Sequence, residues 1–447
     1  LVGNTPMVEA SRLDTGPCRL FIKLEALNPG GSIKDRIGVS MISAAEKRGD
    51  IKPGDLLVEA TAGNTGLGLA LVAAVRGYRL LIVMPDKMSR EKVFNVQAMG
   101  AEVVLTRSDV QKGHPEYYQD MAERLAGERG GYYINQFGNV DNPAAHETTT
   151  GPEILEQMDG KVDAIVLGVG TSGTLTGVSR YFRKASPATE FVLADPVGSV
   201  LADYINCGTL GEASRWLVEG IGEDFIPSIA DFSAARRAYA ISDAESFATA
   251  REVLRKEGLL LGSSSGTLIA AALRYCREQT TAKRVVTLGC DTGAKYLSKM
   301  YNDFWLAEHG FVAASATGTL ADLITRPHRG HATVTVGPED TLATAHNRLR
   351  DGGYSQLPVV KDGRLVGAVT EADLLHAVIE RKLPFDAPVG RVMNGGFPRM
   401  NVQDPMDWLA ERLVVETAVA IEDGEEFLGL VTRADYLTWI RNQGAQA

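Results

Sequence analysis

Short apolar runs alternate with helical stretches along the first two thirds of the chain. Runs of apolar residues at 79–85, 162–168, 190–194 and 284–289 predict buried strands, and the small and apolar residues of 66–76 and 175–184 predict helices packed on them. Strands that are apolar on both faces are typical of parallel sheets covered by helices. The pattern therefore predicts an α/β fold, in which small molecules bind at the carboxyl ends of strands, where glycine-rich loops open helices.

The pattern changes after Trp305, where an internal repeat begins. Residues 365–374 and 427–436 share the motif G-x-V-T-x-A-D and lie 62 residues apart. In each copy a strand runs into a Thr/Asp turn, so the repeat predicts two similar α+β modules packed as a pair. The predicted limits are 1–307 for the α/β domain, 308–317 for a linker, and 318–383 and 384–441 for the two modules.

Two alternatives stay open for the Thr/Asp turns of the repeat. Thr370 with Asp373, and Thr432 with Asp435, can cap the helices that follow them without any ligand. The same side chains can instead bind the ribose of a nucleotide at one or both modules.

Composition narrows the classes of function. The chain has 447 residues, of which 45% are hydrophobic and 23% are charged, and a formal net charge of −10. This negative charge argues against a general nucleic-acid binder, and no apolar run is long enough to span a bilayer. The cysteines are scattered and form no CxxC pair, so we expect no metal site and reduced thiols in a cytoplasmic protein. They are Cys18, Cys207, Cys276 and Cys290.

A lysine follows a glycine pair in the segment Asn28-Pro29-Gly30-Gly31-Ser32-Ile33-Lys34-Asp35-Arg36. Lys34 lies at the predicted entrance to a helix, where the positive end of the helix dipole opposes protonation of its amine. Such an amine is a candidate for Schiff-base chemistry. Taken alone, the motif is more typical of a solvated surface lysine.

Two further loops are suited to anions. The segment Glu59-Ala60-Thr61-Ala62-Gly63-Asn64-Thr65-Gly66 follows a predicted strand, and its amides and hydroxyls can bind a carboxylate. The segment Gly168-Val169-Gly170-Thr171-Ser172-Gly173-Thr174 also follows a strand, and its glycines and hydroxyls are suited to a phosphate. The alternative for the first loop is a capped turn of a buried helix.

The second loop also has the spacing GxGxxG, and Asp195 ends the next predicted strand. A dinucleotide-dependent oxidoreductase is therefore the alternative class of enzyme, with Asp195 at a ribose. That class leaves Lys34 and the Asn64 loop without a role. Hydroxyls at Thr171, Ser172 and Thr174 also suit a single phosphate better than a pyrophosphate.

A third loop lies within Gly258–Thr267. It follows a predicted strand and contains three serines before the next predicted helix. Serines in this position are often only caps, but here they can present a hydroxyl to a ring nitrogen. A phosphate loop, a carboxylate loop and a mobile lysine together indicate a pyridoxal 5′-phosphate (PLP) site that handles an amino acid.

In this order, the motifs closely resemble those of PLP enzymes with the tryptophan synthase β-subunit fold, fold type II. The most similar families are cysteine synthase and cystathionine β-synthase. The resemblance covers nearly all of residues 1–306 and includes Gly3-Asn4-Thr5-Pro6 and Met84-Pro85-Asp86-Lys87-Met88-Ser89. The C-terminal pair resembles the tandem CBS-domain (Bateman) module, which often binds adenosyl ligands.

The resemblance implies a role for individual residues. Lys34 is the Schiff-base and catalytic lysine, Asn64 contacts the ring hydroxyl of PLP, and Ser264 bonds the pyridine nitrogen. The phosphate is held by Gly170, Thr171, Ser172, Gly173 and Thr174. The substrate-binding residues are Thr61, Ala62, Gly63, Thr65, Gln136 and Gly220. A neutral serine at the ring nitrogen favours β-elimination and replacement over transamination.

The choice of substrates rests on fewer residues. The loop 219–227, Glu-Gly-Ile-Gly-Glu-Asp-Phe-Ile-Pro, is similar to the cystathionine β-synthase form of a loop beside the second substrate. With the C-terminal pair, it favours a lyase that converts serine and homocysteine to cystathionine and water, with production of hydrogen sulfide as a further activity. Ala62 in place of the family's serine, and Phe137 in place of a tyrosine, keep cysteine synthesis from O-acetylserine and sulfide as the alternative.

Three further expectations follow from the resemblance. No segment matches the haem-binding extension of some animal members, so haem is not predicted. A homodimer or higher homo-oligomer is expected. A ligand-sensing protein with an inactive catalytic domain is a different class of hypothesis, which the presence of Lys34, Asn64 and Ser264 disfavours.

Overall fold

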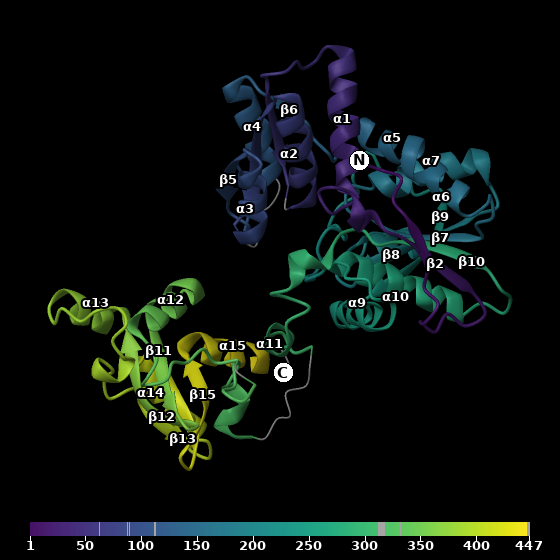
Figure 1. Cartoon of the computed structure of the whole chain (residues 1–447). Helices are drawn as coiled ribbons and strands as arrows, with labels where there is room; N and C mark the ends of the chain where they lie inside the picture. Colours follow the sequence, from purple (N-terminus) through teal and green to yellow (C-terminus); the bar gives the residue numbers. More distant parts are fainter. Residues whose placement is uncertain are drawn as a thin grey trace. The chain divides into compact units, whose positions relative to one another are not determined.

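The computed structural model describes residues 1–61, 63–86, 88, 90–110, 113–311, 318–330 and 332–444 (Figure 1). The chain forms two compact units, Leu1–Leu297 and Ser298–Ala447. The predicted linker, 308–317, lies mostly outside the described residues, and the domain limits stay a prediction.

The first unit contains a six-stranded sheet in the order β1-β2-β10-β7-β8-β9. Strand β1 is antiparallel to β2, and all other neighbours are parallel. The strands are β1 Met7–Glu9, β2 Arg19–Lys23, β7 Ala164–Gly168, β8 Glu190–Pro196, β9 Ala235–Ile241 and β10 Arg284–Leu288. Helices α9 (Asp243–Glu257) and α10 (Ser263–Arg277) lie on one side of this sheet. Helices α5 (Asp141–Ala145), α6 (Gly151–Gln157) and α7 (Gly173–Ala185) lie on the other (Figure 1).

A second sheet, of four parallel strands in the order β5-β4-β3-β6, completes the first unit. The strands are β3 Leu56–Ala60, β4 Arg79–Pro85, β5 Glu102–Thr106 and β6 Tyr132–Tyr133. Successive side chains point to opposite faces, so Leu57 and Ile82 join one apolar cluster while Val58 and Leu81 join another. Both clusters are buried, as the uninterrupted apolar runs predict.

The remaining helices of the first unit connect and cover these sheets. They are α1 Lys34–Arg48, α2 Asn64–Arg76, α3 Arg90–Ala98, α4 Tyr118–Arg129, α5 Asp141–Ala145, α6 Gly151–Gln157, α7 Gly173–Ala185 and α8 Leu201–Cys207. A π-helical turn, His146–Thr150, joins α5 to α6. Apart from one strand, the predicted helices and strands of this unit are present, with limits that differ by a few residues.

One predicted strand is wrong. Residues 258–262, all of which are described, contain an isolated bridge between Leu261 and Thr292 instead of a strand. Helix α9 extends to Glu257, and Gly258 reverses the chain with a left-handed φ of 73°. Too few residues therefore remain before α10 begins at Ser263 for a strand to form.

Helices α1 and α2 pack closely enough to fix the start of each relative to the other. A methyl group on Gly68 of α2 would lie 2.7 Å from the carbonyl oxygen of Lys34, and one on Gly38 of α1 would lie 2.8 Å from the carbonyl carbon of Gly68. Only glycine permits this approach. The contact places the first turn of α1, with Lys34, beside the first turns of α2, which begins at Asn64.

The second unit repeats one arrangement of helix, strand, strand and helix. The first copy is α12 Leu342–Gly352, β11 Gln356–Lys361, β12 Arg364–Thr370 and α13 Glu371–Ile379. The second copy has α14 Met406–Val415, β14 Ala418–Asp423, β15 Glu426–Thr432 and α15 Arg433–Gly444, with β13 Arg399–Asn401 beside β14. Helix α11, Asp303–Glu308, also belongs to this unit.

The two copies agree in fine detail. Both strand pairs are antiparallel, and each has a register shift, between Val359 and Val360 in one and between Ile421 and Glu422 in the other. These shifts lie at equivalent positions of the repeat. A shared apolar cluster joins the copies, with Phe397 and Phe427 among its buried members. The internal repeat found in the sequence is thus a structural repeat.

Candidate active site

Lys34 is the first residue of α1, as predicted, and the preceding glycine loop is held against the segment that follows β10. Ile33 N donates to the carbonyl oxygen of Cys290 at 2.9 Å, and Thr292 N donates to that of Gly31 at 3.0 Å. Burial lowers the pKa of the Lys34 amine, and the nearby Cys290, among other acidic groups, opposes this. A larger fraction of neutral amine results, which is the nucleophilic form.

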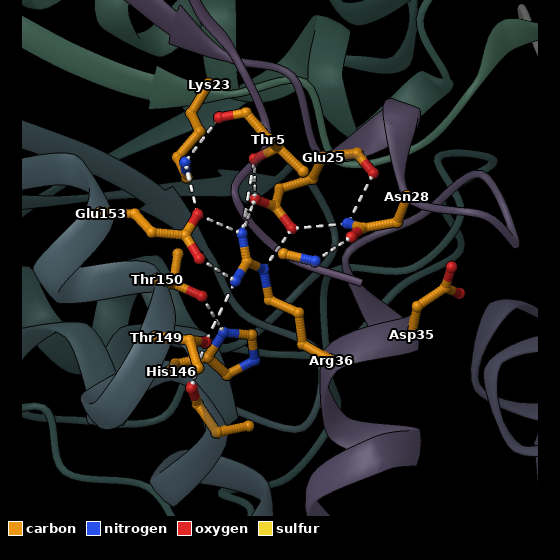
Figure 2. Close-up of polar contacts among 12 residues, drawn as sticks. Thr5, Lys23, Glu25, Asn28, Asp35, Arg36, His146, Thr149, Thr150 and Glu153 are labelled. Carbon is orange, nitrogen blue, oxygen red and sulfur yellow. Dashed lines mark hydrogen bonds and ion pairs between the residues drawn. The ribbon is translucent and has the colours of Figure 1, made fainter. Parts of the chain in front are cut away.

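A buried network of charges surrounds Arg36, which follows Lys34 by two residues in α1 (Figure 2). Arg36 Nε donates to Glu25 Oε2 at 2.7 Å, and Arg36 Nη2 donates to Glu153 Oε2 at 2.7 Å. Lys23 Nζ lies 2.8 Å from the same Glu153 oxygen. These contacts connect α1 to β2 and α6. They therefore fix the position of the first turn of α1, which carries Lys34. The sequence reasoning did not identify this network, because Glu25 and Glu153 lie far apart along the chain.

Asn64 is the first residue of α2, and both the nitrogen and the oxygen of its side-chain amide are hydrogen-bonded. Its Nδ2 donates to Asp291 Oδ2 at 2.8 Å, and its Oδ1 accepts from Lys295 Nζ at 2.7 Å. Tyr296 donates its hydroxyl to the same Asp291 oxygen at 2.7 Å. These bonds set the orientation of the amide and leave the second Nδ2 hydrogen for a ligand. Sequence reasoning did not identify Asp291, Lys295 or Tyr296.

The predicted carboxylate loop lies at the end of β3. Gly63 N donates to Thr61 Oγ1 at 3.2 Å, and Thr65 Oγ1 donates to Gln136 Oε1 at 2.6 Å. Gln136 Nε2 donates in turn to the carbonyl oxygen of Ala60 at 3.1 Å. Four of the predicted substrate-binding residues are therefore neighbours here. Ala62, which belongs to the same prediction, lies outside the described residues.

The predicted phosphate loop lies between β7 and α7, as its composition indicates. Ser172 has a φ of 70°, and α7 starts at the next residue, so the first amides of the helix face the loop. A methyl group on Gly170 would lie 2.7 Å from the carbonyl oxygen of Gly220, and one on Gly173 would overlap Asn142. A loop this tightly packed, with backbone amides and hydroxyls at a helix N-terminus, fits a phosphate group.

His146 is a residue of this loop's surroundings that sequence reasoning missed. Its Nε2 lies 3.3 Å from Thr174 Oγ1, and its Nδ1 lies 2.9 Å from Thr150 Oγ1. Burial, with the charges of Arg36 and Lys34, holds the pKa of His146 well below its usual range. The neutral imidazole therefore orients the Thr174 hydroxyl without adding charge.

Ser264 is buried in the first turn of α10, where its hydroxyl bonds the thiol of Cys290. Its neighbour Ser263 accepts a hydrogen bond at Oγ from Glu219 N at 3.0 Å. The loop between α8 and β9 therefore contacts α10 at Glu219 and the phosphate loop at Gly220. Through Cys290, Ser264 is also connected to the loop that carries Lys34.

The dinucleotide alternative fits the structure poorly. Asp195 is fully buried at the end of β8, and its Oδ2 accepts from Ala202 N in the first turn of α8 at 2.8 Å. Burial raises the pKa of this carboxyl to about 6. Asp195 is thus an internal helix cap and does not face a ligand's ribose.

In the second unit, the Thr/Asp turns are helix caps. Thr370 and Asp373 form a capping box at α13, and Thr432 and Asp435 exchange the equivalent hydrogen bonds at α15. Asp435 Oδ1 also accepts from Thr325 Oγ1 at 2.8 Å. The capping interpretation is confirmed, whereas ribose binding stays a prediction.

The described part of the chain contains neither a metal-binding group of side chains nor a membrane-spanning helix. No group of three or more His, Cys, Asp or Glu side chains in the described ranges is placed to hold a metal ion. Likewise, none of the helices formed by those residues is long and apolar enough to cross a membrane.

Comparison with known proteins agrees with this site. The sequence profile of pyridoxal-phosphate dependent enzymes matches residues 1–291, and that of the CBS domain matches residues 321–380. Cystathionine beta-synthase from Rattus norvegicus is 38% identical over 429 residues, which are 93% of this chain and 75% of that protein. Cysteine synthase A from Escherichia coli (strain K12) is 42% identical over 301 residues, 66% of this chain and 92% of that protein.

Solved structures also show similarity to a cystathionine beta-synthase. The crystal structure of an O-acetylserine dependent cystathionine beta-synthase from Helicobacter pylori is 36% identical, with a TM-score of 0.62 over 67% of this chain and 95% of that chain. Fold and site together define a pyridoxal-phosphate dependent enzyme of fold type II, followed by a CBS domain. Within this class, the chain belongs to the cystathionine β-synthase family.

Proposed function

We propose that this protein is a lyase that replaces the hydroxyl of serine with homocysteine, giving cystathionine and water. The observation that carries the proposal is the similarity to cystathionine beta-synthase, which extends over 93% of the chain and so includes the second unit. The loop 219–227 supports it, because this loop packs between α10 and the phosphate loop, beside the proposed cofactor site.

Pyridoxal phosphate, when bound, supplies an electron sink for a negative charge at the substrate's Cα. The proposed roles of this chain's residues follow from the positions described above. Lys34 holds the cofactor and moves the α-proton, Asn64 donates to the ring oxygen, and Ser264 bonds the ring nitrogen. The phosphate is held by Gly170, Thr171, Ser172, Gly173 and Thr174. The substrates are bound by Thr61, Ala62, Gly63, Thr65, Gln136 and Gly220.

A second candidate function is cysteine synthesis from O-acetylserine and sulfide. Phe137 favours it, because its ring packs 5.8 Å from that of Phe225 and offers no hydroxyl to a leaving group. The similarity to cysteine synthase A points the same way.

A paired-substrate assay separates the two functions. Purified protein is given serine with homocysteine, and separately O-acetylserine with sulfide, and kcat/KM is measured for cystathionine and cysteine formation. We expect the first pair to be used more efficiently, and hydrogen sulfide to form when cysteine replaces serine in the first pair. A higher kcat/KM for the second pair would refute the proposed substrates and leave a cysteine synthase with a CBS-domain module.

We further propose a regulatory nucleotide, such as an adenosyl compound, at Thr370 and Asp373 or at Thr432 and Asp435. Titration calorimetry with AMP, ATP and S-adenosylmethionine tests this, and the absence of heat with all three would leave these residues as caps only. A homodimer or higher homo-oligomer, the absence of haem and a cytoplasmic location also stay predictions. Sedimentation and the absorbance spectrum of the purified protein test the first two.

A further inference from the structure

The side chain of Glu223 places a carboxyl group beside the proposed cofactor site. The residue lies in the loop between α8 and β9, and its backbone is held on both sides. Glu223 N donates to Ser199 Oγ at 3.1 Å, and its carbonyl oxygen accepts from Val200 N at 3.0 Å. The preceding Gly222 N donates to the carbonyl oxygen of Val169, at the phosphate loop, at 2.8 Å. The position of Glu223 is therefore fixed by both neighbouring segments.

The side chain of Glu223 faces the site. A methyl group on Gly170 would lie 3.9 Å from Glu223 Oε1, so the carboxyl group lies over the phosphate loop. The charge of Lys34 acts on Glu223, and that of Glu223 acts on Lys34. The carboxyl group therefore lies close to both the proposed phosphate site and the proposed Schiff-base amine.

The surroundings of Glu223 favour its neutral form. Burial raises the pKa of Glu223 well above its usual range, and the carboxylates of Asp224 in its own loop and Asp195 on β8 raise it further. The ammonium form of Lys34 acts in the opposite direction. The charge of Glu223 also acts on Tyr117 and Tyr118, at the start of α4. These effects favour the carboxylic acid form of Glu223, which has a proton to donate.

Loss of a serine hydroxyl requires such a proton, because hydroxide is a poor leaving group. Two residues that would supply hydroxyls in the resembling families are absent, since position 62 is alanine and position 137 is phenylalanine. We propose that Glu223 is the general acid that protonates the departing hydroxyl of serine. This inference rests on the proposed function, because an acetate leaving group would need no such acid.

The step balances in atoms and charge. Lys34 takes the α-proton, the electron pair of the Cα–H bond forms the Cα–Cβ double bond, and the Cβ–O bond breaks. The proton of Glu223 joins the leaving oxygen to form water, which leaves Glu223 as a carboxylate. When homocysteine adds, its thiol proton returns to Glu223 as the C–S bond forms, and Lys34 returns its proton to Cα.

The test compares two leaving groups in one variant. Glu223→Gln keeps the shape of the side chain but cannot donate the acidic proton. With homocysteine as the partner, kcat for serine should fall about 10²-fold or more, whereas kcat for O-acetylserine should be unchanged. Glu212→Gln, the same change at an exposed position of the same loop, is the matched control and should leave both rates unchanged.

A second measurement uses the protein without cofactor or substrate. The infrared carbonyl band of a protonated carboxylic acid should be weaker in apo Glu223→Gln than in apo wild type at neutral pH. In the Glu212→Gln control, this difference should be absent. Equal bands in wild type and Glu223→Gln would overturn the inference, because Glu223 would then be ionised.

The outcomes distinguish this inference from the proposed function. Wild type that uses O-acetylserine but not serine refutes the proposed substrates and, with them, the need for the acid. Wild type that uses serine, with Glu223→Gln equally active, overturns the role of Glu223 alone and assigns the proton to Lys34 after it has taken the α-proton. A rise in KM for homocysteine with unchanged kcat would also overturn it, because Glu223 would then bind the ammonium group of the second substrate.

Discussion

Substitution of Arg36 by methionine should destabilise the first unit strongly, because this side chain neutralises two buried carboxylates. Its guanidinium group contacts Glu25 and Glu153 at 2.7 Å each, and the three side chains are 2%, 0% and 13% exposed. Arg36→Met keeps much of the apolar stem but leaves Glu25 as a buried charge without its partner. Removal of one partner from a buried ion pair costs about 3–5 kcal/mol.

The pKa of Glu153 gives an independent magnitude. Burial acts to raise it, but hydrogen bonds from Arg36 and Lys23 outweigh this, and folding lowers the pKa from 4.5 to about 2. At about 1.4 kcal/mol for each pH unit, this corresponds to about 3 kcal/mol. Because the folded-state pKa is depressed, this stabilisation is present above pH 4.5 and is lost as the pH falls toward 2. It agrees with the lower end of the range expected for the broken pair.

The assay must observe the first unit by itself, because a chain with two compact units does not unfold in one step. Urea titration with pulsed hydrogen exchange, followed on peptides from α1 and α6, satisfies this condition. We expect Arg36→Met to lose about 3–5 kcal/mol at pH 7 and the double variant Arg36→Met, Glu25→Gln to recover part of it. Arg19→Met is the control, because its pair with Glu9 is exposed to solvent and contributes little to stability. A loss below about 1 kcal/mol in Arg36→Met would refute the reasoning.

Three further predictions concern the site itself. Borohydride reduction of the PLP-loaded protein should attach the cofactor to Lys34, as seen in peptide maps. The variant Lys34→Ala should lose both this label and the yellow colour. Label on another lysine would contradict the assignment of Lys34 as the Schiff-base residue. Gly173→Ala should weaken PLP binding at least tenfold and destabilise the protein by about 1–3 kcal/mol, because the new methyl group overlaps Asn142. The exposed Gly127→Ala in α4 should instead be neutral or stabilising by about 1 kcal/mol, and equal effects of the two would refute the packing argument. Burial raises the pKa of Glu59 from 4.5 to about 8, so wild type should lose unfolding free energy over this range as the pH rises. Glu59→Gln should lose less in urea titrations at several pH values, and parallel pH profiles would contradict the assigned ionisation.

Sequence patterns predicted those parts of the site that are contiguous in the chain. Three motifs each predict the start of a helix, and the structure has α1, α2 and α7 at these points. The motifs are the glycine pair before Lys34, the Asn64 loop and the Gly170–Thr174 loop. Local rules suffice here, because backbone amides at a helix N-terminus and glycine's freedom are properties of a few adjacent residues.

Residues that act through distant contacts were not predictable in this way. Asp291 contacts Asn64 across 227 positions, and Arg36 contacts Glu153 across 117. No motif distinguishes His146 from a surface residue, and Glu223 lies in the loop 219–227, which the sequence indicates only by resemblance. A single sequence does not reveal the burial of either side chain. The strand predicted before Ser263 failed for a related reason, since the apolar run there fills a short buried connection between two helices.

Burial favours the neutral forms of several ionisable groups around the proposed cofactor site. Burial lowers the pKa of Lys34 and of His146, and it raises the pKa of Glu223. The loop Gly170–Thr174 itself carries no basic side chain, so a phosphate there is bound by amides, hydroxyls and the dipole of α7. A fixed cation in the loop would have to be buried at a cost of several kcal/mol, whereas helix amides are already desolvated and oriented. Burial thus favours the form of Lys34 that acts as a base, and the form of Glu223 that acts as an acid, in the proposed reaction.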